Sequence, residues 1–282
     1  MLNCFGLLFT EALSCYTVAM PDFKKPIRAQ KPKDTSWDAV APWYDDLLES
    51  GAGTYQTDLV LPNLLRLLDA RRGETVLDLA CGQGFFSREI VKTGATVVGA
   101  DLSKELIDLA RAQSPKEIKF VVTPADALTF LNANSVDAIV CVLAIQNIKK
   151  PSAVFAECAR VLKSGGRMIF VLNHPAFRVA KRSSWGFDEK AKVQYRRVDE
   201  YISESETDIV MNPGGKTPVT TASFHHPLQF YFKALHKAGF AVSRLEEWTS
   251  AKQSQPGPRA SAENKSRKEF PMFMALEMRK LA

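Results

Sequence analysis

Residues 76–84 read Val-Leu-Asp-Leu-Ala-Cys-Gly-Gln-Gly, a short apolar run that ends in two glycines separated by one residue. The run predicts a buried strand that enters a tight turn, and residues 85–93 continue as a helix. Glycine lets the backbone approach a ligand closely, and the free amides at a helix start favour an anion. The stretch therefore predicts a ligand-binding strand–turn–helix unit, with a plain tight turn as the alternative.

A carboxylate follows the next apolar run along the chain. Asp101 stands 19 residues after Gly82 and directly after residues 96–100. In nucleotide-binding α/β folds, an acid at this place accepts the hydroxyls of a ribose. A dinucleotide fingerprint has a third glycine where this chain has Ser87, and it usually lacks an acid at the position of Asp78. A carboxylate at position 78 suits a ligand that carries an amino group better than it suits a pyrophosphate.

Strands and helices alternate around this unit. Strands are predicted over 76–80, 96–100, 118–122, 136–143 and 167–172, and helices over 37–70 with a break at 51–53, 85–93, 103–113 and 151–163. This alternation predicts an α/β fold with a doubly wound, mostly parallel sheet. Residues 173–226 interrupt it as an insertion. A helix over 227–238 and strands over 240–245 and 273–278 then bring the sheet to seven strands with a terminal antiparallel hairpin, joined by a long mobile loop over 253–268.

Composition excludes several classes of protein. The 282 residues are 46% hydrophobic and 24% charged, which is typical of a globular enzyme and not of a disordered or collagen-like chain. No run reaches the roughly 18 apolar residues of a membrane span. The net charge is +6, with an excess of basic residues in 173–200 and 251–282. Those stretches favour a solvated basic face, and an anionic partner is the alternative.

The cysteines and the N-terminus bear on location. Five cysteines without metal-ligand spacing predict a reduced, cytoplasmic protein with no metal site. Residues 1–19 lack the basic residues of a leader peptide, and the composition changes at Met20, which we expect to be the true start. We expect residues 1–36 to be a poorly ordered extension and residues 37–282 to form the functional domain.

Several motifs in order resemble the class I S-adenosylmethionine-dependent methyltransferases, which have a Rossmann-like fold. They are the 76–84 stretch, Asp101, Ala125-Asp126-Ala127-Leu128, residues 135–140 and residues 160–166. The resemblance covers roughly residues 37–278 and implies S-adenosylmethionine as the cofactor. It implies a glycine turn for the methionine part, Asp101 for the ribose, Leu102 beside the adenine and Asp126 for the adenine amino group. The full set of cofactor residues that it implies is Tyr44, Asp78, Ala80, Gly82, Gly84, Asp101, Leu102, Asp126, Ala127 and Leu143, with Tyr44 on an N-terminal helical lid.

The resemblance places the acceptor pocket in the insertion over 173–226. His174 follows the fifth strand and is the candidate general base, with a structural role beside Pro175 as the alternative. Tyr195 and Gln146 are the other candidate catalytic residues. Arg178, Arg196 and Arg197 suit a carboxylate or phosphate on the acceptor.

The sequence thus predicts an enzyme that moves the sulfonium methyl group to a small-molecule acceptor by in-line displacement, with an anionic acceptor as one option. It predicts no stable nucleic-acid partner and no membrane partner. Two alternatives stay open. One is an RNA methyltransferase that uses the basic insertion and the C-terminal loop, and the other is a non-catalytic, cofactor-binding regulator.

Overall fold

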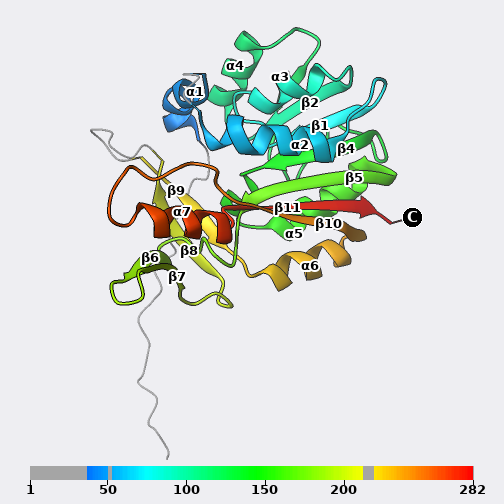
Figure 1. Ribbon diagram of the computed structural model, residues 1–282. Helices are drawn as coiled ribbons and strands as arrows, with labels where there is room; N and C mark the ends of the chain where they lie inside the picture. Colours follow the sequence, from blue (N-terminus) through cyan, green and yellow to red (C-terminus); the bar gives the residue numbers. More distant parts are fainter. Residues whose placement is uncertain (1–36, 50–52, 212–218, 282) are drawn as a thin grey trace, which may run out of the picture. The chain divides into compact units, whose positions relative to one another are not determined.

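A seven-stranded sheet forms the centre of the described chain, with strand order β10-β11-β5-β4-β1-β2-β3 (Figure 1). The computed structural model describes residues 37–49, 53–211 and 219–281, which belong to one unit over 34–282. The strands are β1 (Thr75–Leu79), β2 (Thr96–Asp101), β3 (Lys119–Val122), β4 (Val136–Val142), β5 (Leu162–Asn173), β10 (Phe240–Trp248) and β11 (Phe273–Lys280). Neighbours from β3 to β5 pair in parallel, whereas β11 pairs antiparallel with both β5 and β10. The predicted doubly wound sheet with its terminal antiparallel pair is confirmed.

Helices cover both faces of this sheet because each buried strand presents apolar side chains alternately to the two sides. The helices are α1 (Ala41–Glu49), α2 (Leu61–Leu68), α3 (Phe85–Val91), α4 (Lys104–Gln113), α5 (Pro151–Val161), α6 (Leu228–Lys237) and α7 (Ala260–Glu269). Leu64 of α2, Ile90 of α3 and Ile107 of α4 share one buried cluster. Phe155 of α5 and Leu235 of α6 belong to the other. Packing in these two clusters holds the helices against the sheet and so fixes the edge at which the parallel strands end.

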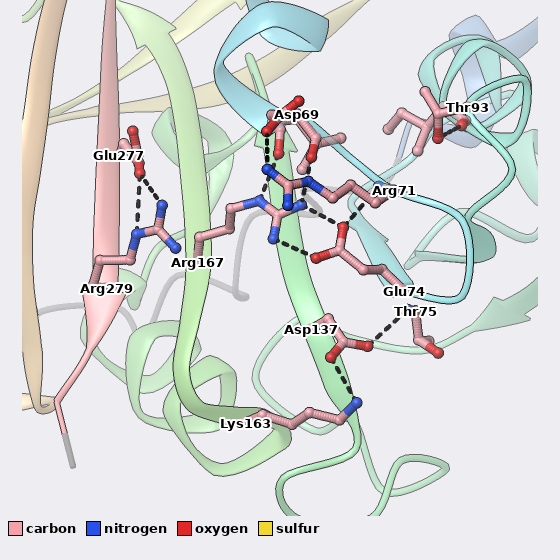
Figure 2. A network of polar contacts seen from close by, with 12 residues as sticks. Asp69, Arg71, Glu74, Thr75, Thr93, Asp137, Lys163, Arg167, Glu277 and Arg279 are labelled. Atoms are coloured by element: carbon pink, nitrogen blue, oxygen red, sulfur yellow. Dashed lines mark hydrogen bonds and ion pairs between the residues drawn. The ribbon is translucent and has the colours of Figure 1, made fainter.

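The opposite edge, where these strands begin, is closed by ion pairs (Figure 2). The buried guanidinium of Arg167 on β5 donates to both carboxylate oxygens of Glu74, at 2.9 and 2.6 Å, and also to the carbonyl oxygens of Leu68 and Asp69 at the end of α2. These bonds lower the pKa of Glu74 to about 2. Bidentate pairs of this kind hold geometry well. These contacts hold the edge of the sheet that lies opposite the ends of the parallel strands.

The insertion contains two antiparallel hairpins, which the sequence did not predict as strands. They pair β6 (Ser183–Asp188) with β7 (Val193–Val198), and β8 (Ser205–Val210) with β9 (Thr220–His225). The prediction of a loop over 253–268 is wrong in its second half, because α7 begins at Ala260. Ser266 is the one buried residue recorded for α7, so the segment lacks the apolar periodicity that marks a helix in sequence.

The predictions for residues 1–36 lie outside the described residues, as does the side chain of Tyr44 on α1. Among the residues that are described, none of the helices has the length and apolar character needed to cross a bilayer.

Candidate active site

A cavity of about 290 Å³ lies at the edge where β1, β2 and β4 end. Its walls come from the turn after β1, the residues after β2 and β3, the segment after β4, and Trp37 before the first helical turn. The lining residues are Trp37, Ala80, Cys81, Gly82, Gln83, Phe85, Phe86, Ala100, Asp101, Leu102, Leu106, Thr123, Pro124, Ala125, Asp126, Val142, Leu143, Ala144, Asn147, Ile148, Lys149 and Lys150. In open α/β sheets this edge, where strand order reverses, is where ligands bind.

The glycine turn shapes one wall through backbone conformations that favour glycine. Ala80, Gly82 and Gly84 have φ angles of +56°, +57° and +82°. Ala80 and Gly82 line the cavity, whereas Gly84 does not. A Cβ at Gly84 would lie 2.9 Å from the Phe120 ring, so this glycine serves the packing of α3 against β3. Ala80 and Gly82 of the turn thus face the cavity, whereas Gly84 serves packing.

Asp101 is held in place by two backbone amides. Its Oδ2 accepts the N–H of Gly82 at 2.8 Å, and its Oδ1 accepts the N–H of Ser103 at 2.9 Å. Burial raises the pKa of this carboxyl, and the amide donors partly offset that effect. Each carboxylate oxygen keeps a further lone pair for a donor. The residue is therefore a fixed acceptor in the cavity wall, directed by the glycine turn itself.

Asp126 and Leu102 form a second, complementary wall. Leu102 lines the cavity and is 47% exposed, so its apolar surface is accessible to a ligand. Within the described part of the chain, the carboxylate of Asp126 has no recorded hydrogen bond or ion pair, and it too lines the cavity. An apolar surface beside an unpaired acceptor suits a flat ring that carries an amino group. Ala127 is not in the lining, because its N–H donates to the Pro124 carbonyl and its own carbonyl accepts the Thr123 hydroxyl.

Asp78 lies beneath the turn and does not line the cavity. It is 1% exposed and accepts a hydrogen bond from the Ser87 hydroxyl at 2.6 Å. Burial raises its pKa to about 7, with the nearby Asp101 adding to the effect and Ser87 opposing it. Ser87, at the position where a dinucleotide site has its third glycine, thus secures the carboxyl that the sequence analysis singled out. Asp78 can therefore affect a bound ligand only through the position of the glycine turn above it.

Gln146 lies on the segment after β4, close to the cavity, but it is not one of the lining residues. The Gln146 side-chain amide donates to the Leu143 carbonyl at 2.6 Å, and its Oε1 is buried with no hydrogen-bond partner in the described chain. Leu143 lines the cavity with a φ of +54°. Asn147, which the sequence analysis missed, also lines it and donates to the Ala222 carbonyl of β9 at 3.1 Å. Hence the second hairpin of the insertion reaches the cavity edge.

His174 and Tyr195 lie elsewhere, which corrects the expectation that the insertion brings them to the cavity. His174 is 2% exposed, its Nδ1 accepts the Ala176 N–H at 3.2 Å, and its Nε2 lies 2.7 Å from Glu247. Burial lowers its pKa against the opposing effect of Glu247. Tyr195 is 48% exposed on the β6–β7 hairpin. Both ring nitrogens of His174 are thus engaged, and neither His174 nor Tyr195 is among the residues that line the cavity.

The residues present fit a nucleoside that carries an amino group: a fixed carboxylate, a second carboxylate with no partner among the described residues, an apolar wall and a glycine turn. Trp37 and Lys149 are lining residues without a sequence motif, so only their place in the fold identifies them. Across residues 37–49, 53–211 and 219–281, no group of three or more His, Cys, Asp or Glu side chains could hold a metal ion.

Comparison with known proteins agrees with this geometry. Residues 77–170 match a family described as a methyltransferase domain. A ubiquinone biosynthesis O-methyltransferase from Thiobacillus denitrificans is 32% identical over 115 residues, which cover 39% of this chain and 50% of that protein. A demethylmenaquinone methyltransferase from Renibacterium salmoninarum is 33% identical over 145 residues, covering 50% of this chain and 59% of that protein. The similarity thus extends over about half the length of these curated relatives.

A solved structure is similar over more of the chain. The crystal structure of an S-adenosylmethionine-dependent methyltransferase from Mesorhizobium loti superposes with a TM-score of 0.63 and 25% identity. It covers 80% of this chain and 100% of that one. The overall fold is therefore shared with a protein that is named as S-adenosylmethionine dependent.

Proposed function

The chain belongs to the class I S-adenosylmethionine-dependent methyltransferases, and from this premise we propose that it transfers a methyl group to a small-molecule acceptor. One observation carries the proposal. The same cavity is lined by the amide-fixed carboxylate of Asp101, by the apolar Leu102 and by the carboxylate of Asp126, which has no partner among the described residues. That arrangement matches the ribose and the adenine amino group of this family's cofactor.

Family membership implies S-adenosylmethionine as the cofactor, which supplies a methyl group on a sulfonium already activated for displacement. In our proposal Asp101 accepts the ribose hydroxyls, Asp126 accepts the adenine amino group, and Leu102 packs against the ring. Ala80 and Gly82 provide backbone next to the methionine part. Asp78, Gly84 and Ala127 support these walls without lining the cavity.

The cavity offers little acid–base machinery, so positioning is proposed as the main source of catalysis. The titratable side chains in its described lining are Cys81, Asp101, Asp126, Lys149 and Lys150. Burial raises the pKa of Cys81 well above its usual range, so its thiol stays protonated. No histidine is among the described lining residues. An acceptor that brings its own nucleophilic atom, such as an amine, a stabilised carbanion or a phenolate, is therefore favoured over an unactivated alcohol.

Two lysines support an anionic acceptor. Lys149 and Lys150 are exposed and line the cavity on the segment after β4, and Lys149 has only a 3.6 Å contact with Glu206. A negative group on the acceptor would gain from both charges. In-line attack on the methyl then depends on how this segment orients the acceptor. Here Gln146 acts as a positioning residue, through its hydrogen bond to the Leu143 carbonyl.

The curated relatives carry names of small-molecule methyltransferases, and neither RNA methylation nor a purely regulatory role is favoured by them. We also propose a reducing, cytoplasmic location. The described cysteines Cys81, Cys141 and Cys158 are free and buried, as suits a protein that forms no disulfides.

A turnover screen tests the proposal. The full chain is incubated with S-adenosylmethionine and a panel of small amines, phenols and carbon acids, with bulk RNA as a separate arm, and S-adenosylhomocysteine is measured. Release with at least one small molecule, abolished in Asp101→Ala, is expected. Release with RNA alone, or none with any acceptor despite tight cofactor binding, would contradict it.

A further inference from the structure

A second cavity, of about 170 Å³, lies outside the proposed cofactor site. Its lining residues are Tyr55, Phe177, Arg178, Trp185, Arg196, Ser250, Arg267, Phe270, Pro271 and Met272, and none of them lines the first cavity. Most come from two segments, the insertion after β5 and the connection between β10 and β11. These are the two segments in which the sequence has its excess of basic residues.

Three arginines line this cavity and no acidic residue does. Within the described residues, Arg178, Arg196 and Arg267 form no ion pair with a carboxylate. Other arginines of the chain are paired, such as Arg167 with Glu74 at 2.6 Å and Arg160 with Glu157 at 2.7 Å. Guanidinium groups gathered without counter-charge repel one another unless an anion lies between them. The charge pattern therefore points to an anionic ligand.

The hydrogen bonds of these arginines leave donors available. Arg196 is oriented by the Phe177 carbonyl at 2.8 Å and the Ser183 hydroxyl at 2.7 Å. Arg267 has longer bonds, at 3.3 and 3.2 Å, to the Ser254 hydroxyl. The guanidinium of Arg178 has no hydrogen bond to any described residue and lies 6.0 Å from the centroid of the Phe273 ring. The positive charge of Arg178 also contributes to a lowered pKa of Arg196, after desolvation, so the two guanidinium groups interact. Arg178 is thus the group with its whole fork free.

Aromatic rings form the remaining wall. Phe270 contacts Phe177 and Trp185 edge-on, with ring centroids 5.6 and 5.4 Å apart. Trp185 is 45% exposed, and the Arg196 guanidinium stacks over it at 5.1 Å. A flat apolar group can pack against these rings while its charge faces the arginines. At 170 Å³ the cavity is smaller than the roughly 300–1,000 Å³ of drug-sized sites and suits a single ring.

We infer that this cavity binds a small aromatic anion, a single ring that carries a carboxylate or a phosphate. The Arg178 fork pairs with the anionic group, Arg196 and Arg267 add charge, and Trp185 and Phe270 hold the ring. Planar bidentate pairing of this kind is what guanidinium offers and an ammonium does not. The inference concerns a site separate from the first cavity and stands whether or not the chain transfers methyl groups.

Binding of benzoate and phenyl phosphate to the full chain tests the inference. Ligand-observed nuclear magnetic resonance titration follows both, with neutral benzamide and inorganic phosphate as comparison probes. We expect a dissociation constant on the order of 1 mM or tighter for at least one aromatic anion, and binding of benzamide and inorganic phosphate at least tenfold weaker. Arg178→Gln should weaken aromatic-anion binding at least tenfold, because a charge-assisted bidentate contact is lost.

Two matched variants make the result specific. Arg197 lies next to Arg196 on β7, but it is exposed, pairs with Asp199 at 2.9 Å and does not line the cavity. In Arg197→Gln the affinity for the aromatic anion should therefore stay within about twofold of wild type. Asp101→Ala should also leave the affinity for the aromatic anion unchanged, which would show that the anion does not bind in the first cavity. Equal losses in Arg178→Gln and Arg197→Gln, binding of benzamide as tight as benzoate, or no binding of either aromatic anion would overturn the inference. Inorganic phosphate binding as tightly as phenyl phosphate would overturn the aromatic specificity.

Discussion

Replacing Asp101 with alanine should weaken S-adenosylmethionine binding strongly and leave the chain folded. A hydrogen bond to a charged group contributes about 1.5–3 kcal/mol, and two ribose hydroxyls would lose their acceptor. Since water partly replaces the carboxylate, we expect a loss of about 2–4 kcal/mol, or about 30- to 900-fold in the dissociation constant. Isothermal titration calorimetry measures it.

The stability of the same variant follows from the other contacts of Asp101. The amides of Gly82 and Ser103 lose their acceptor, which costs about 1 kcal/mol each. Against this, the variant removes a carboxylate whose raised pKa shows that the fold disfavours its charge. The free energy of unfolding should therefore fall by no more than about 1–2 kcal/mol. Asp108→Ala, at an exposed acid on α4, is the control. If Asp101→Ala binds S-adenosylmethionine within twofold of wild type, the assignment of the ribose acceptor is refuted.

Three further outcomes are expected from urea unfolding and activity measurements. Gly84→Ala should destabilise the chain by about 1–3 kcal/mol more than Gly165→Ala. Both positions have positive φ angles, but only Gly84 has a ring atom within 2.9 Å of the new Cβ. Equal losses of unfolding free energy in the two variants would refute the packing role of Gly84. Since the pKa of Asp78 is raised from 3.8 to about 7, its stabilising contribution is complete below about pH 4 and is lost as the pH rises through 7. Asp78→Asn should therefore match wild type near pH 4 and exceed it by roughly 2–4 kcal/mol at pH 8, and parallel pH profiles would contradict this. His174→Ala should lower the free energy of unfolding by about 2–3 kcal/mol, while turnover of the folded variant stays within a few-fold of wild type. A more than tenfold loss of turnover at unchanged cofactor affinity would restore His174 as the general base.

The sheet could be predicted from sequence because its central strands β1 and β4 are buried on both faces. Val136–Val142 and the strand before the glycine turn are mainly apolar runs, each with one aspartate, and glycines or a capping serine mark the helix ends. The carboxyl-edge rule then brings Asp101 and Asp126 to one cavity without any knowledge of side-chain contacts.

The acceptor side could not be predicted in the same way. The strands β6 and β7 contain no buried residue, so no apolar alternation toward a core marks them in the sequence, and α7 is polar nearly throughout. His174 follows β5 in the chain as predicted, but it is buried and pairs with the half-exposed carboxylate of Glu247, far away in sequence. Arg178 and Arg196 do converge, on a cavity that also depends on Phe270 and Arg267. Pairings between distant, exposed segments leave no periodic signal in one sequence.

Calorimetric titration of the full chain with S-adenosylmethionine, and in parallel with a nicotinamide dinucleotide, tests the central claim most directly. The cavity geometry predicts S-adenosylmethionine binding with a dissociation constant on the order of 1 μM, about −8 kcal/mol, and no measurable dinucleotide binding. Dinucleotide binding in the absence of S-adenosylmethionine binding would contradict the assignment of the first cavity and the methyl transfer proposed from it.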